Sequence, residues 1–185
     1  SLFFYFQAAA VAVFGIKVWP MHLVPAIIGI LSVLALWALA KKLFNARVAF
    51  LAAIFMASSA WHVTHSRTGF RAILVPLFST LFFYLAYLAF KEISAKKRVV
   101  FAVLSGMVLA LGFYTYPSYR AIILIILALS AVILLIKLDI FKNFWQEILI
   151  GIIAASLIAA PLAIYFANHP WDFAGRAGYV SVFNK

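Results

Sequence analysis

Long uncharged runs, separated by short basic breaks, constrain this chain more than any other feature of its sequence. No Asp, Glu, Lys or Arg occurs within residues 18–40, 48–66, 72–90 or 99–119. A helix needs roughly 17–25 mainly apolar residues to cross the hydrocarbon core of a bilayer. Two further uncharged runs, 121–136 and 148–171, are close to this length or exceed it. The pattern therefore predicts a protein that crosses a membrane several times.

The composition excludes a soluble domain for the same reason. Hydrophobic residues make up 68% of the 185-residue chain, and charged residues make up only 10%. So few charges cannot cover the surface that a water-soluble domain of this size exposes. The net charge of +11 sits in the breaks between apolar runs, so it predicts contact with lipid headgroups and no nucleic-acid partner.

The predicted fold class is all-α, a polytopic bundle of transmembrane helices in a single domain, residues 1–185. Backbone groups in hydrocarbon must bond to one another, and stretches such as AIILIILALSAVILLI lack the alternation of barrel strands. The run 2–16 is too short to span, which leaves about six spans and an extracytoplasmic tail at 168–185. The predicted spans lie near 22–40, 48–65, 72–90, 99–116, 121–137 and 148–167.

Every second connection is basic, which predicts the orientation of the chain. The breaks 41–47 (KKLFNAR), 91–98 (KEISAKKR) and 137–147 carry clustered lysines and arginines. Cytoplasmic loops carry such an excess, so we place these three breaks in the cytoplasm. The connections 65–71, 114–120 and the tail then lie on the extracytoplasmic side.

The connections on that side hold the candidate binding residues. The sequence HSRTGFR (65–71) has two arginines four positions apart, which share a face if the helix continues. The sequence YTYPSYR (114–120) combines three tyrosines, a proline and an arginine. A guanidinium binds phosphate through two parallel hydrogen bonds, so this side suits a lipid phosphate that carries a sugar. The alternative is that the arginines contact headgroups and the tyrosines form an interfacial belt. The candidates are Arg67, Arg71, Arg120, Arg176, Tyr114 and Tyr116.

Histidines and carboxylates narrow the chemistry. His62 and His65 are three positions apart, but no carboxylate lies near them in sequence, so we predict no metal site and no cofactor. Three of the four carboxylates, Glu92, Asp139 and Glu147, belong to the cytoplasmic breaks and are predicted to be solvated. Asp172 is the remaining carboxylate and follows the last apolar run.

The motifs together resemble a known family. Residues 3–67 are similar to the amino-terminal part of GT-C glycosyltransferases, in particular the protein O-mannosyltransferase and aminoarabinose transferase group, families 39 and 83. The likeness rests on a short helix ending in FG, the basic turn KKLFNAR, the pair Ser66-Arg67 and the element LGFYTYPSYR (111–120).

The resemblance implies a function. It implies a glycosyltransferase that moves a sugar from a polyprenyl-phosphate donor to a protein, lipid or glycan acceptor at the extracytoplasmic face of a prokaryotic plasma membrane. Arg67 and Arg120 become the preferred phosphate contacts, Arg176 a third, and Tyr114 and Tyr116 line the donor cavity. It also implies that residues 1–17 form a juxtamembrane helix on the outer face.

One expected residue is not in the sequence. In the family, the catalytic Asp lies in an outer loop upstream of the segment that matches 2–16, and this chain begins after that point. We therefore expect the chain to be a fragment whose catalytic acid lies upstream of Ser1. Two other functions stay open, a transporter or flippase of anionic lipid and a non-catalytic membrane subunit. A transporter predicts charges at mid-membrane or paired half-helices.

Overall fold

The computed structural model describes residues 1–136 and 138–169, without the side chains of Leu134 and of residues 138–142. The candidate Arg176 and the remaining carboxylate, Asp172, lie outside these residues. The predicted all-α fold is confirmed, and no strand occurs in the described part of the chain. The elements are α1 (Leu2–Phe14), α2 (Val18–Leu43), α3 (Ala46–Ser58), α4 (Ala60–Thr68), the 3₁₀ turn η1 (Arg71–Ile73), α5 (Leu74–Lys91), α6 (Ala95–Phe113), the 3₁₀ turn η2 (Pro117–Arg120), α7 (Ala121–Ile136) and α8 (Leu138–Asn168).

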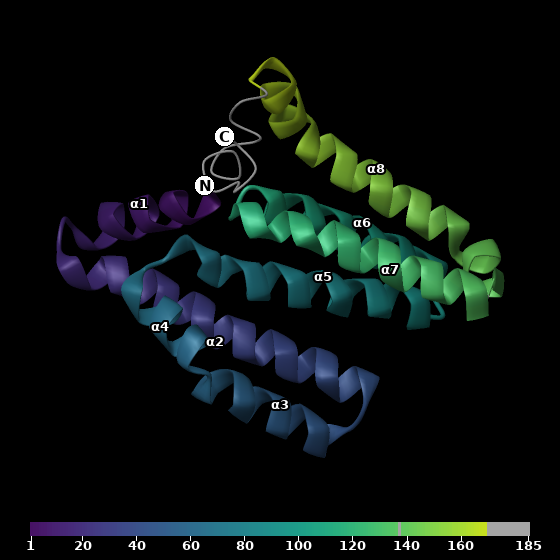
Figure 1. Ribbon diagram of the computed structural model, residues 1–185, viewed down its shortest axis with the longest axis horizontal. Helices are drawn as coiled ribbons and strands as arrows, with labels where there is room; N and C mark the ends of the chain where they lie inside the picture. Colours follow the sequence, from purple (N-terminus) through teal and green to yellow (C-terminus); the bar gives the residue numbers. More distant parts are fainter. Residues whose placement is uncertain (137, 170–185) are drawn as a thin grey trace, which may run out of the picture.

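The long helices pack in a row in the order α3, α2, α5, α6, α8, and each contacts its neighbours in that row (Figure 1). Helix α1 lies beside the beginning of α2 at one end of the bundle, where α4 also packs on α2. The turns 65–71 and 114–120 lie at this same end, which we call the aromatic end. The basic connections between α2 and α3 and between α5 and α6 lie at the opposite end.

The number of clear spans is smaller than the six predicted. By length and composition, three described helices or helix segments can cross a membrane, Val18–Leu43, Arg71–Lys91 and Asn143–Asn168, and α3 with α4 makes a fourth if the bent pair is one span. Helix α6 has the length, but Lys96, Lys97 and Arg98 occupy its first turn. Helix α7 has only 16 residues, one turn less than a typical span.

The predicted single helix over 48–65 is wrong, because the chain bends by 57° between α3 and α4. Ser59 has extended backbone angles, φ −63° and ψ 122°, and belongs to neither helix. The preceding hydroxyl, of Ser58, donates to the carbonyl of Ile54 and so competes for the helical ladder. The bend turns α4 onto α2, where the buried His62 lies within hydrogen-bond distance of the Gly29 carbonyl.

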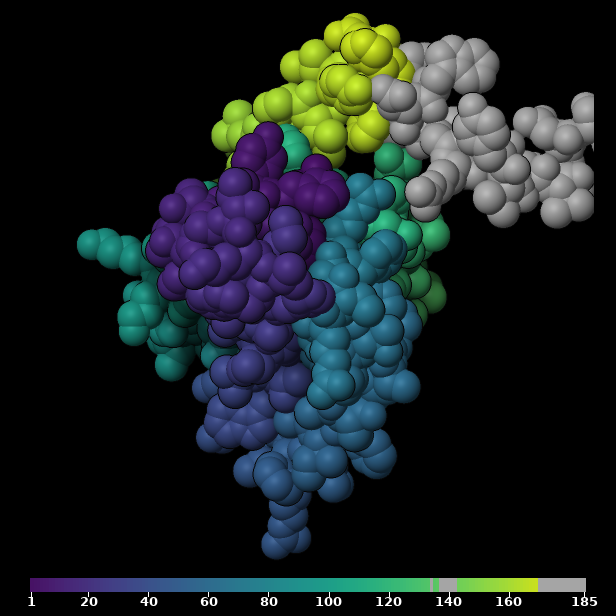
Figure 2. Space-filling view, turned by 90° about the vertical axis from the view of Figure 1, so that its left-hand side faces the viewer, coloured from purple at the N-terminus to yellow at the C-terminus, as the bar shows by residue number. Residues whose placement is uncertain are grey.

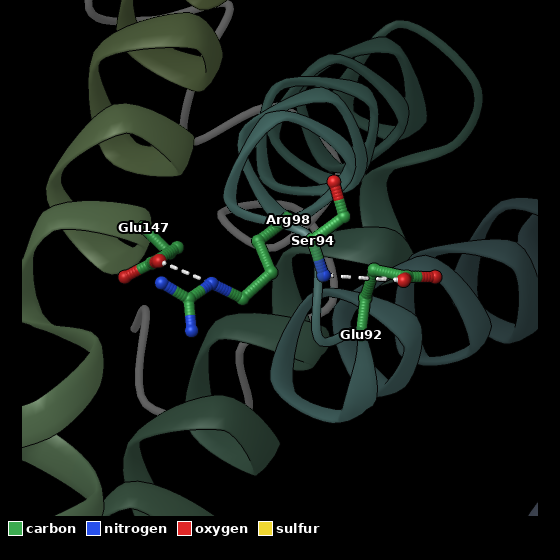
Figure 3. A network of polar contacts seen from close by, with 4 residues as sticks. All are labelled: Glu92, Ser94, Arg98 and Glu147. Carbon is green, nitrogen blue, oxygen red and sulfur yellow. Dashed lines mark hydrogen bonds and ion pairs between the residues drawn. The ribbon is translucent and has the colours of Figure 1, made fainter.

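The predicted loop 137–147 and the predicted solvation of Glu147 are also wrong. Helix α8 begins at Leu138 and continues through this segment, with a kink at Phe144. Glu147 is only 6% exposed, and its carboxylate lies 2.9 Å from Nε of Arg98 on α6 (Figure 3). The contact is a close charge pair and not a well-directed hydrogen bond, since Nε has no partner with suitable hydrogen-bond geometry. The segment from Asp139 to Glu147 therefore belongs to α8, and Glu147 holds α8 against α6.

Farther along the same two helices, beyond the ion pair, small residues let α6 and α8 approach closely. A Cβ atom on Gly106 would overlap the carbonyl oxygen of Gly151 and would lie 3.2 Å from the Cβ of Ala154. Ala102 and Ala110, one turn to either side of Gly106, are buried. Such small-residue contacts let helix backbones pack by close van der Waals contact in a membrane, where no hydrophobic force drives helices together.

Candidate functional site

The two candidate turns meet at the aromatic end, although 43 or more residues separate them in the sequence. The guanidinium carbon of Arg71 lies 5.3 Å from the centre of the Tyr116 ring. Phe70 packs edge-to-face against the same ring at 5.4 Å. Figure 2 views this end of the bundle, with α1 and the beginning of α2 in purple beside the blue segment that contains α4. Two of the predicted candidates, Arg71 and Tyr116, are therefore in direct contact.

The turn 65–71 is shaped by the way α4 ends. A helix leaves its last carbonyls without partners, and Nδ1 of His22 lies 2.6 Å from the carbonyl oxygen of Arg67, where it donates. Gly69 follows with φ 70°, in the left-handed region that glycine adopts without steric cost. This turn breaks the helical spacing. The helix does not continue to Arg71, so the condition under which Arg67 and Arg71 would share a helix face is not met, and Arg67 is exposed.

The turn 114–120 folds back onto α6 because Gly112 has no side chain. The Tyr119 ring occupies the space where a Cβ atom of Gly112 would lie. Tyr119 is 1% exposed, and it packs edge-to-face against Phe113 at 5.5 Å. Burial raises the pKa of the Tyr119 phenol above its ordinary value, so the side chain stays neutral. Pro117, at the first position of η2, has the fixed φ that begins such a turn.

The guanidinium of Arg71 lies over the Tyr116 ring. A guanidinium that stacks on a ring uses its flat face, and its N–H groups lie in the plane of the fork. Within the described residues no hydrogen bond or ion pair involves the side chain of Arg71. The N–H groups of Arg71 can therefore receive a phosphate or carboxylate through two parallel bonds.

Arg120 and Tyr114 face α8. The guanidinium carbon of Arg120 lies 5.2 Å from the centre of the Phe166 ring. The Tyr114 hydroxyl donates to the carbonyl of Ile158 at 2.7 Å. Tyr114 also borders an open cavity of about 300 Å³ between α1, α6 and α8. The turn 114–120 thus has Tyr116 toward α4 and two other candidates toward α8.

Helix α1 is tied to this end by three hydrogen bonds. The Ser1 hydroxyl donates to the carbonyl of Thr115 at 2.8 Å, and the Leu2 amide donates to the carbonyl of Tyr114 at 2.8 Å. Gln7 donates to the carbonyl of Met21 at 3.3 Å. That carbonyl lies four residues before Pro25 inside α2, and a proline has no amide hydrogen to donate to it. The side chain of Gln7 replaces the missing helical bond.

The two histidines of α4, which we predict not to bind a metal, contact different carbonyl groups. His62 faces α2 and is 5% exposed, whereas His65 stacks on the Trp61 ring at 4.1 Å. Among the described residues, no group of three or more His, Cys, Asp or Glu residues could hold a metal ion. Of the described carboxylate side chains, Glu92 follows α5 and Glu147 pairs with Arg98 in the first turn of α6 (Figure 3), and the connection between α5 and α6 lies at the opposite end (Figure 1). The charge that the described side chains bring to the aromatic end is therefore positive.

Sequence reasoning missed the aromatic partners of the arginines. Phe70 belongs to the connection 65–71 and Phe166 to the apolar run 148–171, and only the folded chain brings them to Tyr116 and Arg120. The contact between Trp61 and His65 could have been predicted from the sequence, since residues four apart lie on one helix face. Close aromatic packing in the LGFYTYPSYR element could also have been predicted, because it contains a glycine, which has no side chain, near three tyrosines.

Comparison with known protein families gives one match. The model of the family described as dolichyl-phosphate-mannose-protein mannosyltransferase matches residues 1–165. The match includes α1 and both turns of the aromatic end. Neither the curated proteins nor the solved structures yield a match.

Proposed function

Because the chain belongs to the dolichyl-phosphate-mannose-protein mannosyltransferase family, and so is a GT-C glycosyltransferase integral to the membrane, we propose that its aromatic end binds a polyprenyl-phosphate-linked sugar. The sugar moves from this donor to a hydroxyl of a protein, lipid or glycan acceptor. The reaction takes place at the extracytoplasmic face of a prokaryotic plasma membrane. No cofactor is needed for this transfer.

The observation that carries the proposal is the cation–π contact between Arg71 and Tyr116, which joins two distant turns and places a guanidinium between them. Arg67 is exposed on the same turn as Arg71, and Arg120 lies on the same turn as Tyr116. Three arginines at one end of a membrane bundle suit a phosphate headgroup. Arg176, beyond the described residues, is proposed as a fourth contact.

The proposed chemistry is a direct displacement with inversion. An acceptor oxygen attacks the anomeric carbon, and the bond from that carbon to the phosphate oxygen breaks. The electron pair leaves with polyprenyl phosphate, and a carboxylate base takes the hydroxyl proton. Arginines next to the phosphate stabilise the charge that grows on the leaving group, which is the electrostatic role that lowers such barriers most.

The proposal is tested by replacing the arginines in the full-length enzyme. We expect Arg67→Ala, Arg71→Ala and Arg120→Ala each to reduce transfer from a polyprenyl-phosphate sugar by roughly 10- to 100-fold at normal expression, since a charge-assisted hydrogen bond contributes about 1.5–3 kcal/mol. Arg47→Ala is the matched control, because Arg47 is exposed at the opposite end. Wild-type transfer in all three variants would refute the phosphate role, and an equal loss in Arg47→Ala would refute the assignment of faces.

The alternative functions predict different results. A transporter or flippase would use paired broken helices, and the described residues contain one bent pair, α3 with α4. Movement of labelled polyprenyl phosphate across vesicles without any sugar transfer would favour transport. Absence of both activities in the full-length protein would favour a non-catalytic membrane subunit.

A further inference from the structure

Four aromatic side chains form a continuous row at the aromatic end, and we call them the aromatic row: Trp61, His65, Phe70 and Tyr116. Trp61 and His65 are stacked with ring centres 4.1 Å apart. His65 meets Phe70 at 5.2 Å, and Phe70 meets Tyr116 at 5.4 Å. Arg71 lies over the Tyr116 ring and so closes one end of the row.

The aromatic row is accessible along its length. The exposed fraction of Trp61 is 51% and that of Phe70 is 41%, while His65 and Tyr116 are partly buried. The face of an aromatic ring carries partial negative charge, which attracts the partly positive C–H groups of a sugar ring. A row of rings next to a cation therefore matches a ligand with a pyranose ring next to an anion.

His65 adds a hydrogen-bond acceptor in the middle of the row. Its Nδ1 lies 2.8 Å from the carbonyl oxygen of Trp61, and since a carbonyl can only accept, Nδ1 carries the hydrogen. The other ring nitrogen, Nε2, then has a lone pair in the neutral side chain. Hydroxyl groups of a sugar can donate to such a nitrogen, whereas an alkyl chain of a lipid cannot.

An interfacial belt explains these contacts less well. Belt residues anchor a helix to headgroups one ring at a time, and they need no contact with one another. Here the rings touch in sequence across α4, the turn after it and the turn before η2, and the row ends on Arg71. The arrangement defines a surface with one charged end, which is a directional feature.

We infer that the aromatic row is the subsite for the sugar of the lipid-linked donor, with Phe70 and Tyr116 nearest the phosphate and His65 accepting a sugar hydroxyl. The inference rests on the proposed function, because it places the phosphate of the donor at Arg71. The row distinguishes the sugar-bearing donor from the sugarless product, so it favours donor over product at the same phosphate contacts.

Binding of two lipids to the full-length protein in nanodiscs tests this subsite. The probes are polyprenyl-phosphate mannose and polyprenyl phosphate of the same chain length. We expect the unmodified protein to prefer the mannose lipid. Phe70→Leu should weaken binding of the mannose lipid about 3- to 10-fold, the effect of one aromatic contact, and leave polyprenyl phosphate unchanged. His65→Phe, which keeps an aromatic ring and removes both ring nitrogens, should show the same selectivity.

The control and the Arg71 variant separate the two proposals. Trp37→Leu removes an exposed tryptophan at the opposite end and should change neither affinity. Arg71→Ala should weaken both lipids equally. If it weakens neither, the phosphate site itself is wrong. If Arg71→Ala behaves as expected but Phe70→Leu and His65→Phe alter neither lipid, or alter both alike, the sugar subsite is wrong while the proposed function stands. Equal affinity of the unmodified protein for the two lipids also contradicts the subsite.

Discussion

The Arg98–Glu147 pair gives the sharpest prediction about the bundle itself. The two charged groups approach to 2.9 Å, and the exposed fractions of their side chains are 30% for Arg98 and 7% for Glu147. The guanidinium carbon of Arg98 also lies 5.6 Å from the ring centre of Phe144, at the kink of α8. Phe144 in turn meets Phe90 of α5 at 5.3 Å. The pair therefore joins three helices at the end opposite the turns.

Glu147→Gln keeps the shape of the side chain and removes its charge. Loss of one partner from a fully buried ion pair costs about 3–5 kcal/mol, because the other charge is left without compensation. Arg98 retains contact with solvent over nearly a third of its side chain, so water compensates part of that charge. We expect a loss of about 2 kcal/mol in the free energy of unfolding.

The assay is unfolding of the protein by SDS in mixed micelles, followed by far-ultraviolet circular dichroism. Glu92→Gln is the matched control, since Glu92 lies close by and accepts only a 3.3 Å hydrogen bond from the Ser94 amide (Figure 3). Its expected effect is below about 0.5 kcal/mol, as for most surface changes. If Glu147→Gln is no more destabilising than Glu92→Gln, the ion pair does not stabilise the contact between α6 and α8.

A double variant separates the charge pair from packing. Replacing both charges by apolar groups of similar size is often neutral or stabilising for a buried pair. We therefore expect Arg98→Met with Glu147→Leu to recover most of the stability that Glu147→Gln loses. A double variant as unstable as the single one would mean that shape at this contact matters more than charge.

The remaining predictions concern Gly106, Gly112 and Tyr119. Gly106→Ala places a methyl group on the Gly151 carbonyl, so α6 and α8 must separate, and the same SDS assay should show a loss of about 1–3 kcal/mol. Leu104→Ala, on an exposed face of α6, is its control and should cost less. Gly112→Ala displaces the Tyr119 ring, and we expect transfer by the full-length enzyme to fall at least tenfold as Arg120 moves. Tyr119→Phe should keep both activity and stability, because the buried hydroxyl has no hydrogen-bond partner in the described structure. Full transfer in Gly112→Ala would show that Tyr119 does not position this turn.

The fold follows from the sequence where charges mark the ends of the helices. The prediction for 72–90 is close to α5, and that for 121–137 is close to α7, because lysines and arginines flank both runs. The bend at Ser59 could not be predicted in the same way, since serines are common inside membrane helices and the bend depends on packing against Gly29. Burial of Glu147 depends on a residue 49 positions away, which no local pattern contains.

The site was predictable as a list of residues but not as an arrangement. Both turns were identified by their arginines, because the positive-inside rule does not explain arginines on the side predicted to be extracytoplasmic. The contact between Arg71 and Tyr116 requires α4 to end at Thr68 and the Tyr119 ring to fold over Gly112. Each of these features is a local departure from helical geometry. Periodicity, which identifies helices, contains no information about how they end.

These departures also explain why the aromatic end has a defined shape before any ligand binds. Three carbonyls there accept hydrogen bonds from side chains of other segments: Met21 from Gln7, Arg67 from His22, and Thr115 from Ser1. Each bond ties one segment of this end to another, so the turns cannot move independently. A site held in this way loses little entropy when a ligand orders it, and its arginine and rings act on a phosphate and a sugar without prior rearrangement. The same argument gives α1 a role in binding, because two of the three bonds come from that helix or from the residue before it.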